Sequence, residues 1–557
     1  MVNDDTYILG LDFGTLSVRA AIVRVANGEV CGDAVVEYAT PIMDRTLTAG
    51  DNRPLPPDFA LQVPADYLVA VKEVVPAAIR AADVDADQII AIGLDGTSAT
   101  VLVTDKDGKP LCEDPRFVNE PQAYMKLWKH HGAQAQVERI IALAKERKEP
   151  WLARYGGTLS SEMLLPKALE TLENAPEVYA EAAEIVNLID WLTWLLTGVP
   201  AYAAGDSGYK RMFQDGTYPS RDYLEALNPD FGGVFEEKMS HPIVALGDKV
   251  GGLTAEWAQA FGLKEGIAVA AGNIDAHVHA ASVAAVRPGQ LTGILGTSSC
   301  WILPGEEFKE VPGLFGIVDG GVAPGSWGFE GGQSAVGDIF AWFVDTNVPQ
   351  QYFDEAKEKG TSVHDVLVEK ASAQEIGEHG LVALDWWNGN RSILVDSNLS
   401  GLMIGQSLTT TPVDQYRALL ESTAFGARVI IDNFEEYGVP VEEIRVAGGL
   451  LKNSFLMQMY ADITRRPLRI ASVEQAGAHG SAIFASVAAG AYPDIFAACE
   501  AMGGVAERVY EPNEEASKAY DPLFEIYLEL YDLFGRNNPA MHTLKNIRAA
   551  ALEKKGS

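Results

Sequence analysis

The sequence predicts an α/β protein built from two halves that repeat one plan. Strand-like apolar runs alternate with segments of helical periodicity along most of the 557 residues, a pattern typical of a parallel or mixed sheet covered by helices. A glycine-threonine turn between two strand-like runs occurs near residue 14 and again near residue 296. We therefore divide the chain into two large domains of similar plan, residues 1–284 and 285–557.

The first half opens with a predicted β-hairpin. An apolar run over 7–12 is broken by Gly14 and resumes over 18–25, as expected for two strands joined by a glycine turn. Further on we expect a helix at 65–82, a strand at 88–94, mainly helices over 120–200 with tryptophans in the core, and a loop or irregular strand at 203–213.

The second half repeats this opening and continues with further strands and helices. Its predicted strands are 290–295, 300–303, 443–449 and 467–472, and its predicted helices lie near 332–346, 413–437 and up to about 464. Residues 476–490 are interpreted as a glycine turn that enters a helix of small residues. A charged helix is expected to end the chain.

Composition excludes several functional classes. The 43 basic and 77 acidic residues give a formal net charge of −34, which argues against broad binding of nucleic acid or anionic membranes. No apolar run reaches the length of a membrane span, and the acidic start is not a secretory leader. We expect a cytoplasmic protein, with a homodimer left open. The cysteines are too far apart to suggest a zinc site or a disulfide framework: Cys31, Cys112, Cys300 and Cys499.

The first candidate site is the run Gly10-Leu11-Asp12-Phe13-Gly14-Thr15. A carboxylate at the end of a buried strand can hold Mg²⁺ directly or through water, while turn amides and a threonine hydroxyl contact phosphate oxygens. Alone, this run is equally a hairpin capped by Asp and Gly. The matching turn Gly296-Thr297-Ser298 makes a polyphosphate site between the two turns the more specific hypothesis.

A second candidate is Asp275, which follows the apolar run 267–271 within the sequence GNIDAH. A strand that ends in a carboxylate places it in the crevice where α/β folds bind ligands, so Asp275 is a candidate general base toward a substrate hydroxyl. His277 and His279 have no third metal ligand near them in sequence. We expect packing or supporting roles for both.

A third candidate is glycine-rich. Gly448-Gly449 precedes Asn453, and Gly477 begins a similar run about thirty residues later. Glycines here allow the backbone to approach a flat ring or a phosphate closely. Neither run is a GxGxxG fingerprint or a P-loop, so these nucleotide folds are not supported.

Taken in order, the segments GLDFGT, GNIDAH, ILGTSS, GGLLKNS and GAHGSA resemble the FGGY family of carbohydrate kinases over nearly the whole chain. The resemblance implies two ribonuclease-H-like domains of the actin, hexokinase and Hsp70-like ATPase type, with a catalytic cleft between them. It implies Mg²⁺ bound through water at Asp12 and Asp275 as catalytic base. The residues that it implies for ATP are Gly14, Thr15, Gly296, Thr297, Ser298, Gly448, Gly449, Asn453 and Gly477.

The resemblance also implies a ketopentose site at the Gly96 loop, Lys210, Asp275 and Glu330. Segments such as YGGTLSSEMLLPK and LDWWNGNRS are similar to the corresponding segments of those family members that phosphorylate L-ribulose to L-ribulose 5-phosphate in L-arabinose breakdown. The loop DGTSAT at 95–100 departs from the patterns of other members. Lys210 is otherwise a solvated surface cation, and Glu330 a carboxylate at a helix start. The rival functions are a kinase of another sugar or polyol, and a sugar-independent ATPase or sensor of the same superfamily.

Overall fold

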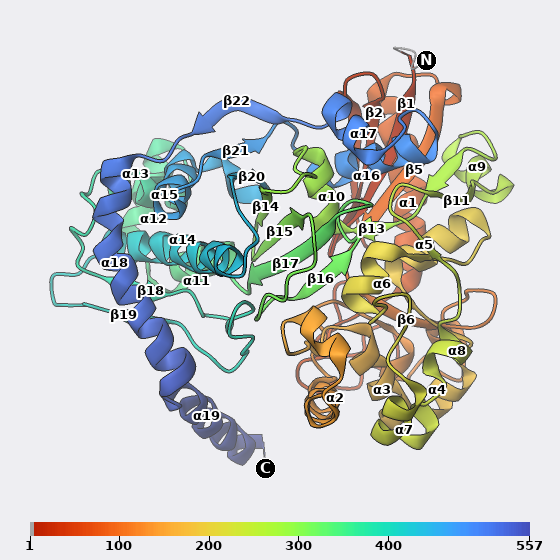
Figure 1. Cartoon of the computed structure of the whole chain (residues 1–557), viewed down its shortest axis with the longest axis horizontal. Helices are drawn as coiled ribbons and strands as arrows, with labels where there is room; N and C mark the ends of the chain where they lie inside the picture. The colour runs from red at the N-terminus through yellow and green to blue at the C-terminus, as the bar shows by residue number, and fades with distance from the viewer. Residues whose placement is uncertain (1–4, 557) are drawn as a thin grey trace.

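The computed structural model describes residues 5–556, with the side chains of 549 and 552–556 left out. The first four residues, on which the interpretation of the N-terminus partly rests, lie outside this range. Two seven-stranded sheets dominate the molecule, one in each half of the chain, with helices layered around them (Figure 1). This arrangement confirms the predicted α/β class.

The first sheet has the strand order β11-β12-β5-β1-β2-β3, with β13 beside β5. β1 and β2 form the expected antiparallel hairpin, β3 pairs antiparallel with β2, β5 and β12 run parallel to β1, and β11 closes the edge antiparallel. The strands are β1 (Tyr7–Phe13), β2 (Ser17–Arg24), β3 (Val30–Glu37), β5 (Ile89–Gly96), β11 (Lys249–Gly252), β12 (Ala268–Ala270) and β13 (Asn273–Ile274).

The second sheet repeats this plan in the order β16-β17-β15-β14-β20-β21-β22. Its antiparallel hairpin β14–β15 is extended by β17, its parallel strands β20 and β21 lie on the other side of β14, and β22 is antiparallel at the edge. The strands are β14 (Gln290–Leu295), β15 (Ser299–Gly305), β16 (Gly316–Asp319), β17 (Trp327–Gln333), β20 (Glu443–Ala447), β21 (Leu468–Ala471) and β22 (Val505–Tyr510). The shared strand order supports the inferred duplication.

In the first half, a helical layer and a small sheet adjoin the large sheet. The predicted helix α1 (Pro64–Ala82) packs on β2 and β3. The small sheet contains β4 (Leu61–Gln62), β7 (Met125–Lys126), β6 (Val101–Thr104) and β8 (Glu184–Asn187). The remaining helices of this half are α2 (Gln134–Arg147), α3 (Leu164–Asn174), α4 (Pro176–Glu181), α5 (Leu188–Thr197), α6 (Ala204–Lys210), α7 (Arg221–Leu227), α8 (Val234–Lys238), α9 (Ala255–Phe261) and α10 (Asp275–Ser282).

Around the second sheet the long helix α14 (Pro412–Glu436) lies in the core, and eighteen of its residues are buried. It starts at Thr411, whose side chain and that of Asp414 form a capping box. The other helices of this half that lie around the second sheet or extend from it are α11 (Gly337–Asn347), α12 (Gln350–Lys359), α13 (Val363–Ser372), α15 (Ser454–Thr464), α18 (Glu514–Asp532) and α19 (Ala540–Gly556).

Late in the sequence the chain returns to the first sheet. Helix α16 (Ala476–Ala488) packs on β1, β5 and α10, and α17 (Ile495–Met502) packs on α16 (Figure 1). The contact is close because both sides are small: a Cβ added at Gly10 would lie 1.8 Å from the carbonyl oxygen of Ala478, and one at Gly93 1.9 Å from that of Ser481. Glycine is therefore required at both strand positions.

Three local predictions are wrong. Residues 203–213 are not a loop, since most of them form α6, and a Cβ added at Gly208 would lie 2.2 Å from Val318 Cγ1 of β16. Tertiary packing here overrides the weak helix propensity of glycine. Helix α11 starts at Gly337 because residues 327–333 form β17. Gly477 belongs to the first turn of α16 and not to a turn before it.

All four cysteines are free thiols. No helix within residues 5–556 combines the length and apolarity needed to cross a bilayer.

Candidate active site

A cleft of about 980 Å³ opens between the two large sheets. The β1–β2 turn and the β14–β15 turn both line it, together with the start of α10, β17, and the segments around residues 448 and 475. The sequence-predicted residues that line this cleft are Asp12, Gly14, Thr15, Asp275, Gly296, Thr297, Ser298, Glu330, Gly448, Gly449 and Gly477. Elements from the two ends of the chain are thus brought together at one place.

Three predicted residues do not line the cleft. Gly96 ends β5, where an added Cβ would lie 2.8 Å from Ile189 Cγ2, so close packing explains this glycine. Asn453 caps α15, with its Oδ1 accepting the Leu456 N–H at 3.0 Å. Lys210 is buried behind Glu330.

Two carboxylates face each other across neighbouring strands beneath the first turn. Asp12 of β1 and Asp95 of β5 are register partners. Asp95 is fully buried and accepts a hydrogen bond from Ser481 of α16, while its Oδ1 has no partner. Burial and the negative charge of Asp12 raise the pKa of Asp95 well above its usual value. Arg19 compensates part of this charge, with Nη1 3.2 Å from Asp12 Oδ2.

Asp275 is the first residue of α10, and one of its carboxylate oxygens accepts the N–H of Ala276 at 2.7 Å. Burial and the nearby charge of Asp12 raise its pKa to about 7. A carboxyl group with this pKa exchanges a proton near neutral pH, which is the property needed in a general base. It lines the cleft, so a substrate in the cleft can reach it.

A buried ion pair joins the two halves of the chain. Lys210 Nζ of α6 lies 3.1 Å from Glu330 Oε2 of β17, and His277 Nε2 lies 3.2 Å from the same oxygen. Burial alone would raise the pKa of Glu330, but Lys210 and His277 together lower it to about 2. The structural alternatives offered for these two residues are wrong. Lys210 is buried and not a surface cation, and Glu330 lies in strand β17 and not at a helix start. The support that His277 gives Glu330 agrees with the role expected for it.

Several cleft residues were missed by sequence reasoning. Trp128 was interpreted as a core residue, but it lines the cleft, and its indole N–H donates to Thr15 Oγ1 at 3.1 Å. Arg391 also lines the cleft, with Nη2 3.5 Å from Glu162. The only sequence signal for Arg391 was its place in the segment LDWWNGNRS, which resembles known proteins, and nothing in the sequence marked Trp128 as a cleft residue. Nothing in the sequence places Arg391 near Glu162, because the fold alone brings these distant segments together.

The first turn offers few side-chain ligands for a magnesium ion. No group of three or more His, Cys, Asp or Glu side chains in the described part of the chain is arranged to hold a metal. Asp12 offers a single carboxylate at the cleft, close to the threonine and glycine of the first turn. This set fits a hard cation that keeps most of its water and is shared with substrate phosphates.

The cleft thus brings together two glycine turns and a buried carboxyl group from the two halves of the chain. Residues 7–282 match the N-terminal domain, and residues 291–489 the C-terminal domain, of the FGGY family of carbohydrate kinases. The chain belongs to this family, which confirms the resemblance seen in the sequence. It is a sugar kinase, a class of enzyme whose cosubstrate is ATP.

Among curated proteins, a ribulokinase from Mycolicibacterium smegmatis is 50% identical over 545 residues, covering 98% of this chain and 97% of that protein. A ribulokinase from Bacillus licheniformis is 44% identical and covers 96% of this chain and 98% of its own length. Among solved structures, a ligand-bound xylulose kinase from Lactobacillus acidophilus superposes with a TM-score of 0.78 over 95% of this chain and 99% of its own. At 18% identity this last similarity supports the fold alone.

Proposed function

We propose that the protein transfers the γ-phosphoryl group of ATP to L-ribulose, giving L-ribulose 5-phosphate and ADP in L-arabinose catabolism. The choice of sugar rests on the relatives named ribulokinase, which match nearly the full chain. The choice of chemistry rests on Asp275, a cleft-lining carboxyl group with a pKa of about 7.

In this proposal Asp275 accepts the proton of the primary hydroxyl of the sugar. The hydroxyl oxygen forms a bond to the γ-phosphorus in line, the bond from that phosphorus to the β–γ bridging oxygen breaks, and ADP leaves. The contribution of the protein is positioning and electrostatic stabilisation, since phosphoryl transfer requires little covalent participation from side chains.

The two turns would hold the phosphates. The backbone N–H groups of Gly14 and Thr15, and of the facing turn Gly296-Thr297-Ser298, are suited to an anion because amides and small residues supply donors without added bulk. Asp12 would hold Mg²⁺ through water, and a bound Mg²⁺ supplies charge neutralisation at the phosphates. This local chemistry explains how a chain of net charge −34 binds a polyanion.

The adenosine would lie along the second sheet. A Cβ added at Gly449 would meet no atom within 4 Å, and Gly448 has a φ of 110° that favours glycine. Gly477 lines the same cleft, whereas Asn453 does not line it and would contribute only by ordering the start of α15. We therefore propose that residues 285–557 supply the adenosine side and the second phosphate turn, and that residues 1–284 supply the first phosphate turn, the base and, apart from Glu330, the sugar side.

The sugar would be held by a mixed set of donors and acceptors. Asp275 and Glu330 accept from hydroxyl groups, while Lys210 acts by fixing Glu330, its ion-pair partner. Gly96 is placed by packing against Ile189, so its proposed contribution is to shape the loop that follows it.

The test is ADP release measured at initial rate with L-ribulose, D-ribulose, xylulose, ribitol and glycerol, for the native protein and for Asp275→Asn. The expected result is the highest kcat/KM with L-ribulose and loss of turnover in the variant, with ATP binding retained. A higher kcat/KM for another sugar would show that L-ribulose is not the preferred substrate and would put that sugar in its place. ATP turnover unaffected by every sugar would favour the sugar-independent ATPase.

A further inference from the structure

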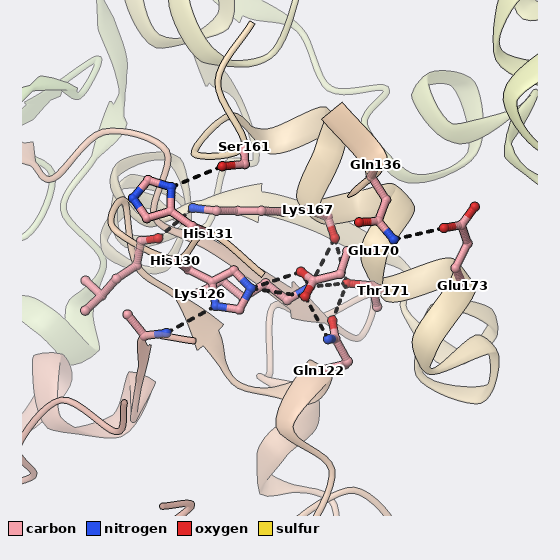
Figure 2. Close-up of polar contacts among 12 residues, drawn as sticks. Gln122, Lys126, His130, His131, Gln136, Ser161, Lys167, Glu170, Thr171 and Glu173 are labelled. Atoms are coloured by element: carbon pink, nitrogen blue, oxygen red, sulfur yellow. Dashed lines mark hydrogen bonds and ion pairs between the residues drawn. The ribbon is translucent and has the colours of Figure 1, made fainter. Parts of the chain in front are cut away.

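A cluster of charged side chains is buried behind the cleft wall in the first half of the molecule. Lys126, His130, Lys167 and Glu170 are each at most 2% exposed. Figure 2 shows them together, with Lys167 and Glu170 one helical turn apart on α3. We call these four residues the α3 cluster. None of them lines the cleft, and the proposed chemistry does not use them.

The charge of Glu170 is satisfied within the α3 cluster. Its carboxylate accepts from Lys126 Nζ at 2.9 Å and contacts His130 Nε2 at 3.0 Å. Because the N–H of Ala60 donates to His130 Nδ1 at 3.2 Å, the ring hydrogen lies on Nε2 and points to Glu170. Lys126 is thus the cationic partner of Glu170, and Lys167 makes no ion pair among the described residues.

Lys167 instead donates to two backbone carbonyls, that of Ala99 at 2.7 Å and that of Leu127 at 2.6 Å. Both belong to segments that reach the cleft. Ala99 follows Thr97 and Ser98, which line the cleft. Leu127 precedes Trp128, whose indole N–H is bonded to Thr15 in the first phosphate turn. One buried amine therefore connects the loop after β5 with the support of the β1–β2 turn.

Burying the Lys167 amine costs more free energy than a side chain that only fills space would cost. An amine without a carboxylate partner is destabilised by burial, and burial lowers the pKa of Lys167 to about 7. Ala99 has a φ of 50°, a backbone region that residues with a Cβ seldom occupy. The Lys167 bond holds the carbonyl of this strained residue, and both the charged and the neutral amine can donate it.

We propose that Lys167 is a positioning residue that holds the loop at 97–100 and Trp128 at a fixed distance from each other. The loop at 97–100, which belongs to the proposed sugar site, and the first phosphate turn are then preorganised together. This inference rests on the proposed function for the identity of the two ligands. Its geometric part, the ordering of the two segments by one amine, does not depend on which sugar is bound.

The test compares Lys167→Met with Thr171→Val. Met keeps the length and burial of the side chain but donates no hydrogen bond. Thr171 lies on the same helix and is equally buried, and its hydroxyl contacts Lys126 and the carbonyl of Lys167 but no cleft segment. For each variant we would measure kcat, the KM values for sugar and ATP, the melting temperature, and amide hydrogen exchange at residues 97–101 and 127–129.

Lys167→Met is expected to raise the sugar KM about tenfold or more, because small displacements of binding groups are expensive, with kcat changed less than the KM. Exchange in the two segments should become faster. Thr171→Val should lower the melting temperature and leave both KM values within about twofold. Unchanged KM and exchange in Lys167→Met, or an equal KM change in both variants, would overturn the inference.

Two further readouts keep the inference falsifiable. If Lys167→Met does not fold, Trp128→Phe decides, because it removes the bond to Thr15, together with part of the ring, and leaves the α3 cluster intact. Unchanged KM values for both substrates in that variant would overturn the inference. If the native protein phosphorylates a sugar other than L-ribulose, the proposed substrate fails and the same comparison is made with that sugar. If no sugar is phosphorylated, the exchange rates alone decide.

Discussion

Asp275 should make the folded protein less stable at neutral pH than an uncharged residue would. Its pKa is raised from 3.8 to about 7, so the folded state binds the proton more tightly than the unfolded state. Stability contributed by the protonated form is fully present below the unfolded pKa and is lost as the pH rises toward 7. Asp275→Asn does not titrate, and its stability relative to the native protein should therefore increase with pH.

The magnitude follows from the shift. About three pKa units at about 1.4 kcal/mol each give an upper bound of about 4 kcal/mol at pH 7 and above. Roughly half of this stability difference, about 2 kcal/mol, develops between pH 5.5 and 8. The other half has already developed below pH 5.5, where the unfolded carboxyl group ionises and the folded one does not. For domains of this size a change of about 2 kcal/mol corresponds to a few °C in melting temperature.

The assay is thermal unfolding of the native protein and Asp275→Asn at half-unit steps from pH 5.5 to 8.5 at constant ionic strength. We expect the variant to melt higher, and the difference between the two to widen with pH and level off near 7. A difference that is constant over the whole range would refute the raised pKa of Asp275.

Three other outcomes are expected. The kcat/KM of the native enzyme should fall below pH 7 with an apparent pKa near that value, because the base must be deprotonated; a flat profile from pH 6 to 8 would contradict the assignment. Lys210→Met should lower the melting temperature and cost on the order of 3–5 kcal/mol, because it leaves the buried Glu330 charge with only His277, whereas Lys210→Met with Glu330→Gln should recover part of the loss in denaturant melts. Asp12→Asn should raise the Mg²⁺ concentration needed for half-maximal turnover, measured after chelation and readdition, and an unchanged Mg²⁺ requirement would place the metal elsewhere.

Patterns within short segments were predicted well from the sequence. The hairpin at β1–β2, its repeat at β14–β15 and the helices α1 and α14 all lie close to their expected bounds, because apolar periodicity and turn residues act locally. The prediction of a loop or irregular strand for residues 203–213 was wrong because the helix there depends on tertiary packing and not on a local pattern. Two glycines weaken the helix signal there, and the close packing of Gly208 on Val318 of β16 is a tertiary contact that the local sequence pattern does not show.

The candidate site residues also fall into two groups, those that a local motif predicts and those that only the folded chain identifies. Glycine turns and carboxylates at strand ends were found from the sequence, since their chemistry is visible in the motif itself. Trp128, Arg391 and Lys167 were not recognised, because their roles depend on partners between 40 and 229 residues away in the sequence, such as Leu127 for Lys167 and Glu162 for Arg391.

By itself, the sequence determined the α/β class, the duplicated plan and the family, since each depends on local periodicity and on motifs whose order is preserved along the chain. Only the tertiary structure decided that Lys210 and His277 hold Glu330, that α16 covers the first sheet, and that Asp12 and burial raise the pKa of Asp275. The physical reason is that burial and electrostatic interaction depend on distances between segments, and these distances exist only when the chain is folded.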